Sequence, residues 1–166
     1  ALTGPSRPSI LVFSRQPTEV PVTGSSFDGA IHGAYIIKNF DDHFSLKKII
    51  IIATGTEVII ALKAAEILQK SNKYNIRVVS MPCFLLFDEQ SDDYKDIIFP
   101  PKSEALRVSV EAGVKFGWGE YSHKHIGVES FGFSASYDDI YKKFGLFPDS
   151  IASKIEKFAE DFYANK

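Results

Sequence analysis

Residues 48–53 constrain the fold most, because they place four consecutive isoleucines between a lysine and an alanine. Such a run of β-branched side chains is typical of a strand buried on both faces of a parallel sheet. The turn at 54–57 follows, and apolar residues then recur at helical spacing through 58–70. Residues 76–80 form a second strand-like run. These elements predict a βαβ unit of about 30 residues, with its two strands parallel.

The alternation of strands and helices continues along the chain. The sequence pattern predicts helices over 91–98, 137–144 and 151–163, strands over 106–110 and 125–128, and a short helical segment after residue 119. Strands that alternate with helices indicate an α/β fold. We therefore predict a three-layer, open, mostly parallel sheet of about five strands, with helices on both faces.

The N-terminal part of the chain has a different character. Residues 9–14 form a short apolar run, which predicts a buried strand. Residues 17–33 are rich in Pro, Thr, Gly and Ser and are too long for an ordinary connection, which indicates a linker. We predict that residues 1–33 are the end of a preceding domain plus a linker, and that 34–166 form the main domain. Because the chain begins at Ala1, close to a strand-like run, we expect a fragment of a longer protein.

Composition excludes several functional classes. With 19 Lys and Arg against 21 Asp and Glu in 166 residues, the net charge is −2, which disfavours duplex nucleic-acid binding. The longest apolar run is far shorter than the ~20 residues of a membrane-spanning helix. The single cysteine, Cys83, cannot close a disulfide within the chain, so a reducing compartment fits best. We expect a cytoplasmic protein with no nucleic-acid or membrane partner.

The turn at Thr54–Glu57 lies where a doubly wound sheet would bind phosphate, at the N-terminus of a helix. It has one glycine followed by an acid, which would repel an anion, and it lacks a complete glycine fingerprint. Thr54 and Glu57 have instead the spacing of a capping box, which satisfies free backbone donors of a helix. The interpretation that we favour is a self-capped helix, and the alternative is a regulatory site for a nucleotide or another anion.

Two charged residues follow predicted strands, at the edge where ligands of open α/β sheets bind. Arg15 comes directly after the 9–14 run, where its guanidinium could hold a phosphate with two hydrogen bonds. A surface arginine at a strand end is an equal alternative. Glu111 ends the strand over 106–110 and could bind a ribose hydroxyl, but without a glycine fingerprint we favour a helix cap or an ion pair.

The remaining chemistry-bearing residues do not form a catalytic set. His123 and His125 are two residues apart with no Asp or Cys close by, so we interpret them as a solvated turn. His32 and His43 are isolated, and Cys83 lies among apolar residues, as a packing residue does. One Gly-rich region gathers aromatic residues that indicate either core packing or a subunit contact: Phe116, Trp118, Tyr121, Phe131 and Phe133.

Seen together, these segments resemble the C-terminal portion of a transketolase. The matching blocks arrive in family order and span nearly the whole chain. They are Ser14-Arg15-Gln16, Thr54-Gly55-Thr56-Glu57-Val58, Arg77-Val78-Val79-Ser80-Met81-Pro82, Phe99-Pro100-Pro101, Val110-Glu111-Ala112-Gly113, Phe116-Gly117-Trp118, Phe131-Gly132-Phe133-Ser134-Ala135 and Phe144-Gly145-Leu146. Two departures stand out: Ser136 replaces a usual proline and Thr56 a usual serine.

The resemblance implies a two-carbon ketol transfer between sugar phosphates in the pentose phosphate pathway. It also implies thiamine diphosphate, a divalent metal (Mg or Ca) and a homodimer in the full-length enzyme. The cofactor and catalytic residues of the family lie upstream, so we expect no catalytic, cofactor-binding or metal-binding residue here. Arg15 resembles the family residue that binds the terminal phosphate of the sugar.

By the same resemblance, this chain alone is expected to be inactive and to serve packing and dimer assembly. Its first segment, including 9–14, resembles the end of the family's pyrimidine-binding domain. Related enzymes such as dihydroxyacetone synthase and the xylulose-phosphate synthase share this domain and are alternatives. A plastid is an alternative location.

Overall fold

A five-stranded sheet forms the centre of the computed structural model, which describes residues 8–14, 17, 19, 27–41 and 46–164. The strand order is β1-β3-β2-β4-β5. β1 runs antiparallel to β3, and the other neighbouring pairs are parallel. The prediction of an α/β fold with a mostly parallel sheet is confirmed. The strands are β1 (Tyr35–Lys38), β2 (Lys47–Ala53), β3 (Tyr74–Ser80), β4 (Ala105–Val110) and β5 (Lys124–Ile126).

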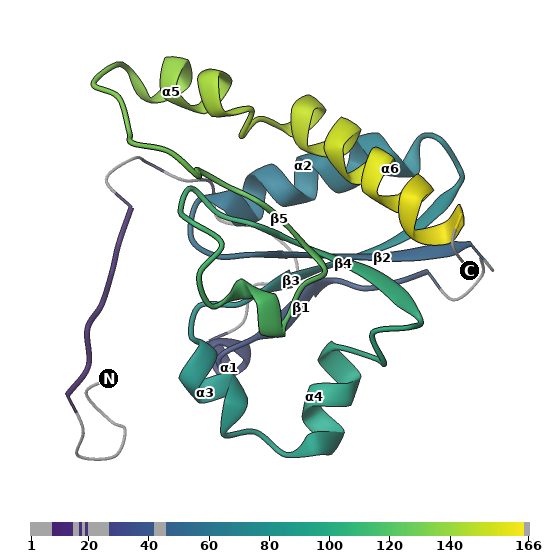
Figure 1. Ribbon diagram of the computed structural model, residues 1–166. Helices are drawn as coiled ribbons and strands as arrows, with labels where there is room; N and C mark the ends of the chain where they lie inside the picture. The colour runs from purple at the N-terminus through teal and green to yellow at the C-terminus, as the bar shows by residue number, and fades with distance from the viewer. Residues whose placement is uncertain (1–7, 15–16, 18, 20–26, 42–45, 165–166) are drawn as a thin grey trace.

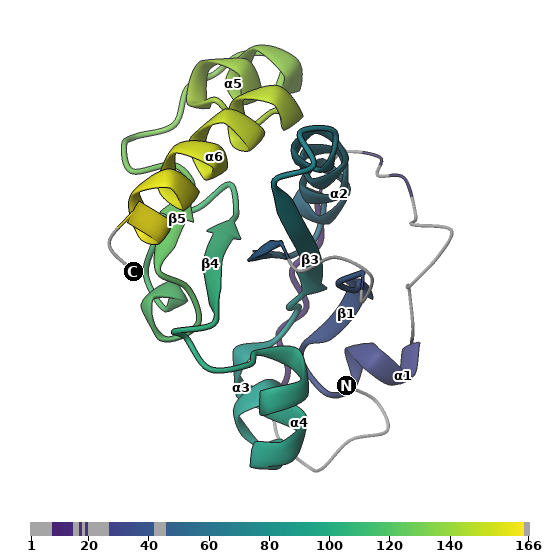
Figure 2. The same cartoon turned by 90° about the vertical axis from the view of Figure 1, so that its right-hand side faces the viewer.

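Helices cover both faces of this sheet, as predicted. Figure 1 shows α2, α5 and α6 on one side and α1, α3 and α4 on the other, and Figure 2 shows the same layers from the side. The helices over 91–98, 137–144 and 151–163 are present as α4, α5 and α6. The bounds are α1 (Phe27–Ala30), α2 (Glu57–Gln69), α3 (Phe84–Asp88), α4 (Asp92–Ile98), α5 (Tyr137–Phe144) and α6 (Pro148–Ala164), with a 3-10 turn, η1 (Trp118–Glu120).

The isoleucines of β2 divide between two hydrophobic clusters. Ile49 and Ile51 pack with residues of α2 and α6, whereas Ile50 and Ile52 pack with residues of α3, α4 and η1. All four side chains are 0% exposed. Successive side chains of a strand point to opposite faces, so an unbroken apolar run needs a cover on each side. Each buried isoleucine contributes roughly 1.5–3 kcal/mol.

Two arginines hold the C-terminal end of α4 against the face of the sheet that α3 and α4 cover. Arg77 on β3 donates from Nη1 to the carbonyls of residues 97 and 98, at 2.7 and 2.9 Å. Arg107 on β4 donates from Nη2 to the carbonyls of residues 99 and 100. Four successive carbonyls at the helix end therefore accept from guanidinium groups, which complements the negative end of the helix dipole. Burial lowers the pKa of the Arg107 guanidinium, which is 6% exposed.

The N-terminal segment differs from its prediction. Residues 8–14 pair with no described strand, and Ile10 and Val12 are 90% and 88% exposed. An apolar run becomes a buried strand only where a neighbouring sheet receives it, and no described strand receives this one. Figure 1 shows the segment on the side where β2, β4 and β5 end.

Three short elements were not predicted: β1, α1 and α3. β1 has only four residues, all of them partly buried, so it lacks the apolar signal of the central strands.

Among the described residues, no helix combines the length and the apolar character that crossing a membrane requires.

Candidate functional site

The edge formed by the carboxyl ends of β2, β4 and β5 is the candidate site, because the sequence places its suggestive residues there. The turn at 54–57 follows β2 and Glu111 follows β4, and these strands are parallel neighbours. His125 lies within β5, next to Ser109 of β4. The fold therefore brings these residues to one edge, where open α/β sheets bind ligands.

At the start of α2, the predicted capping box is absent. The helix begins after Thr56, which makes no side-chain cap, and the amide of Glu57 donates to the backbone carbonyl of Thr54 at 3.2 Å. The carboxylate of Glu57 accepts instead from the hydroxyls of Thr56, at 3.1 Å, and Tyr141. The carboxylate that the capping box would have used is thus bound by Tyr141, a side chain from α5 that is far away in sequence.

This arrangement places a carboxylate at the N-terminus of α2, where it disfavours an anion. Glu57 is 6% exposed, and its negative charge lies where a bound phosphate would carry its own. Burial and the neighbouring Glu57 raise the pKa of the Tyr141 hydroxyl, which stays protonated and donates. The carboxylate already interacts with the positive end of the helix dipole, so the geometry weighs against a nucleotide or anion site here.

At the end of β4, a network of polar side chains holds the following loop. The indole N–H of Trp118 donates to the carboxylate of Glu111, a role that the sequence did not predict. The hydroxyl of Ser109 lies 2.9 Å from His125 Nδ1, and His125 Nε2 lies 3.2 Å from the carbonyl of Gly113. A carbonyl only accepts, so Nε2 carries a proton and donates to Gly113. These contacts use the polar groups of this edge internally.

The solvated turn predicted for His123 and His125 is wrong. Both rings are partly buried, and His123 Nδ1 accepts from the backbone amide of Arg107 at 2.9 Å. Burial and the nearby Arg107 charge lower the pKa of His123, which keeps the ring neutral for this hydrogen bond.

Among the residues that the structure describes, no three His, Cys, Asp or Glu side chains are grouped to hold a metal ion.

The aromatic residues separate into core and surface. Trp118 and Tyr121 are 1% and 8% exposed and belong to the hydrophobic cluster that contains Ile50 and Ile52. By contrast, Phe116 and Phe131 are 90% and 96% exposed. Phe133 is half exposed and packs on Phe144, with ring centroids 5.8 Å apart. The core interpretation is confirmed for Trp118 and Tyr121, and a subunit contact stays a prediction for the exposed Phe116 and Phe131.

The other residues singled out by sequence lie next to the ends of β1 and β3 or outside the described residues. Arg15 and His43 fall outside them. His32 Nδ1 lies 2.7 Å from the carbonyl of Asp28. Cys83 precedes α3, and its amide donates to the carbonyl of Gly33 at 3.1 Å, in keeping with a packing role.

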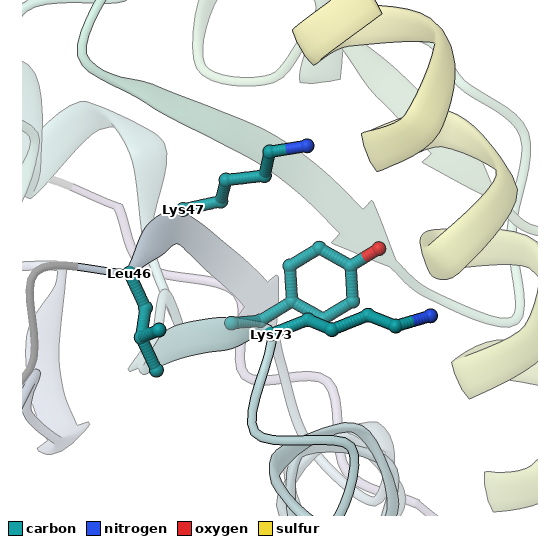
Figure 3. Close-up of a pocket in the computed structure, with 4 residues that line it drawn as sticks. Leu46, Lys47 and Lys73 are labelled. Carbon is teal, nitrogen blue, oxygen red and sulfur yellow. The ribbon is translucent and has the colours of Figure 1, made fainter.

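A hollow of about 340 Å³ lies at the opposite edge, beside the amino ends of β2 and β3, and sequence reasoning missed it. Figure 3 shows the side chains of Lys47 and Lys73 extending in the same direction beside Leu46. Lys73 Nζ pairs with Glu156 at 3.3 Å, so part of the positive charge is offset. Tyr74 also lines the hollow, and burial together with the charge of Glu156 raises its pKa.

Comparisons with known proteins agree on one family. Residues 33–147, more than half of the chain, match the transketolase-like TK C-terminal domain. A chloroplastic transketolase of Solanum tuberosum is 45% identical over 152 residues, which cover 88% of this chain and 20% of the relative. The chain spans about a fifth of the length of such relatives.

Solved structures match equally well. A transketolase from Leishmania mexicana has a TM-score of 0.75 and 42% identity, covering 84% of this chain and 20% of that one. A transketolase from Pichia stipitis in complex with sedoheptulose-7-phosphate has a TM-score of 0.78 and 36% identity, covering 86% and 20%.

Fold and sheet order thus define an α/β domain of the kind found at the C-terminal end of transketolases. The chain belongs to the transketolase family and corresponds to its C-terminal domain.

Replacing Tyr141 by Phe tests the closed helix N-terminus. The substitution removes a donor to a buried carboxylate, so the free energy of unfolding should fall by about 1–3 kcal/mol. Urea denaturation of the chain measures this loss, with Tyr35→Phe as a matched control outside the cluster. An unchanged free energy for Tyr141→Phe would show that the carboxylate of Glu57 does not depend on the hydroxyl.

Proposed function

We propose that this chain is the C-terminal assembly domain of a transketolase that moves a two-carbon ketol unit between sugar phosphates. In this proposal the chemistry belongs to residues that precede this chain in the intact enzyme, and the domain contributes packing and dimer contacts. The chain alone is therefore inactive. The partners are the preceding domains of the same polypeptide and a second copy of the enzyme, without nucleic acid or membrane.

One observation supports assembly over ligand binding: the candidate edge uses its polar groups internally and presents apolar ones outward. Glu57, Glu111 and His125 all make hydrogen bonds within the domain. Phe116 and Phe131, in the loops that follow β4 and β5, have nearly fully exposed rings. Exposed aromatic side chains around a satisfied polar network favour a protein contact over a small anion.

The family implies thiamine diphosphate and a divalent metal, and the described residues do not fit either group. The helix N-terminus that could receive a diphosphate holds the carboxylate of Glu57. No acidic and imidazole side chains gather in the described part of the chain as a metal requires. We therefore assign both groups to the preceding domains, together with the catalytic residues.

Residues 1–33 are proposed to end the preceding pyrimidine-binding domain and to link it to residues 34–166. Arg15 is proposed to bind the terminal phosphate of the sugar in the intact enzyme. A relative crystallised with sedoheptulose-7-phosphate supports phosphorylated sugars as the substrate class. The cytoplasm is the proposed location, and the chloroplastic relative supports a plastid as the alternative.

Turnover tests the division of labour between this domain and the rest of the enzyme. The intact enzyme should transfer ketol units when supplied with thiamine diphosphate and Mg²⁺, whereas the 166-residue chain under the same conditions should not. A coupled assay on a pentose phosphate pair measures both. Ketol transfer by the chain alone would contradict the proposal.

The phosphate role of Arg15 makes a separate prediction for the intact enzyme. Arg15→Ala should raise KM for phosphorylated sugars by about ten- to a hundred-fold, because a charge-assisted hydrogen bond is lost. KM for unphosphorylated sugars should change little, and Arg7→Ala is a nearby arginine control. Equal losses on both kinds of substrate would rule out a contact with the phosphate.

A further inference from the structure

Phe116 combines near-complete exposure with a rigidly held backbone. Its side chain is 90% exposed, and the neighbouring Val114 is 56% exposed. The loop that carries them connects β4 to η1 at the carboxyl edge of the sheet. A large apolar side chain in water gains free energy when a partner covers it.

The loop is held on both sides of Phe116 by hydrogen bonds. After Phe116 in the chain, the buried Trp118 donates from its indole to Glu111 at the end of β4. Before Phe116 in the chain, the carbonyl of Gly113 accepts from His125 Nε2 at 3.2 Å and from the amide of Val128 at 2.8 Å. These contacts tie the loop to both β4 and β5.

Gly117 brings the backbone of the same loop close to Phe84 of α3. Its φ is +84°, and a Cβ there would lie 3.2 Å from the ring of Phe84. Phe84 in turn packs edge-on against Trp118, with ring centroids 4.8 Å apart. A side chain at position 117 would therefore be strained and would press on Phe84, so the loop requires glycine directly after Phe116.

A rigidly presented aromatic residue suits the centre of an interface, since little conformational entropy remains to be lost on binding. Phe131 is as exposed, at 96%, but its segment is less constrained: Ser130 Oγ contacts the carbonyl of Phe131 at 3.4 Å in an exposed position. Phe116 is therefore the better candidate for an anchor.

The side on which Phe116 lies indicates the partner. The chain spans about a fifth of its relatives, so most of a transketolase polypeptide lies outside it. Residues 8–14, the first that the structure describes, lie on the side where β2, β4 and β5 end (Figure 1). The loop of Phe116 leaves β4 on this same side.

We propose that Phe116 is the anchor with which this domain docks into an apolar pocket on the preceding part of its own polypeptide. Glu111 and His125 are positioning residues, because they hold the loop and do not contact the partner themselves. This inference rests on the proposed assembly function and names the partner of one surface.

Photo-cross-linking in the intact enzyme tests the partner directly. With Phe116→p-benzoylphenylalanine, we expect cross-linked peptides between residue 116 and the part of the same polypeptide that precedes this chain. Ile97 on α4, which is 62% exposed, is the matched control position and should give few cross-links. A dimer-sized product joined through residue 116, or a yield no higher than at Ile97, would overturn the proposal.

Hydrogen exchange gives a second readout and tests the positioning residues. In the intact enzyme, Phe116→Ser and Glu111→Ala should each speed exchange of the 112–117 amides at least about ten-fold, as expected when an interface anchor is lost. Glu111→Gln, which can still accept from the indole, should restore protection, and Ile97→Ser should have no effect. Unchanged exchange in Phe116→Ser would overturn the inference. An intact wild-type enzyme that cross-links as expected but transfers no ketol units would contradict the proposed function alone.

Discussion

The burial of β2 on both faces is the constraint on which the rest of the structure depends. Its isoleucines alternate between two hydrophobic clusters, so the strand is stable only with helices above and below it. α2 and α6 provide one cover, and α3, α4 and η1 provide the other. Because the helices occupy both faces, the loops at the strand ends are left to meet solvent or a partner.

The polar side chains at this edge of the sheet are satisfied within the domain, which supports the proposed contact role of its loops. The carboxylates of Glu57 and Glu111 each accept from an aromatic side chain, Tyr141 and Trp118 respectively. A ligand-binding edge keeps hydrogen-bond donors free for the ligand. At this edge, the donors and acceptors of the side chains described above bond to groups of the domain itself. What it presents outward is Phe116 and other apolar side chains.

Much of the fold could be predicted from the sequence, because its signals are strong and local. The isoleucines of β2 and the amphipathic pattern of α5 predicted both elements, α5 at its observed bounds. β1 escaped prediction because it has four partly buried residues and an antiparallel position at the sheet edge. Residues 9–14 read as a buried strand, but strand formation depends on a receiving sheet.

The candidate site was harder to predict, because long-range contacts override its local patterns. Thr54 and Glu57 have capping-box spacing, yet Tyr141, 84 residues beyond Glu57, takes the carboxylate. His125 looked solvated because nothing nearby in sequence could bind it, and its partners Ser109 and Gly113 come from β4 and the loop after it. Arg15 lies outside the described residues, so its phosphate role stays a prediction.

The most direct test of a docking domain with a closed ligand edge is isothermal titration calorimetry of the purified chain. The titrants are thiamine diphosphate with Mg²⁺, a ribose phosphate and adenine nucleotides. We expect only heats of dilution for all of them, because Glu57 occupies the helix N-terminus that an anion would need. Stoichiometric binding of a nucleotide would instead establish a regulatory site, and binding of thiamine diphosphate would show that part of the cofactor site lies in this chain.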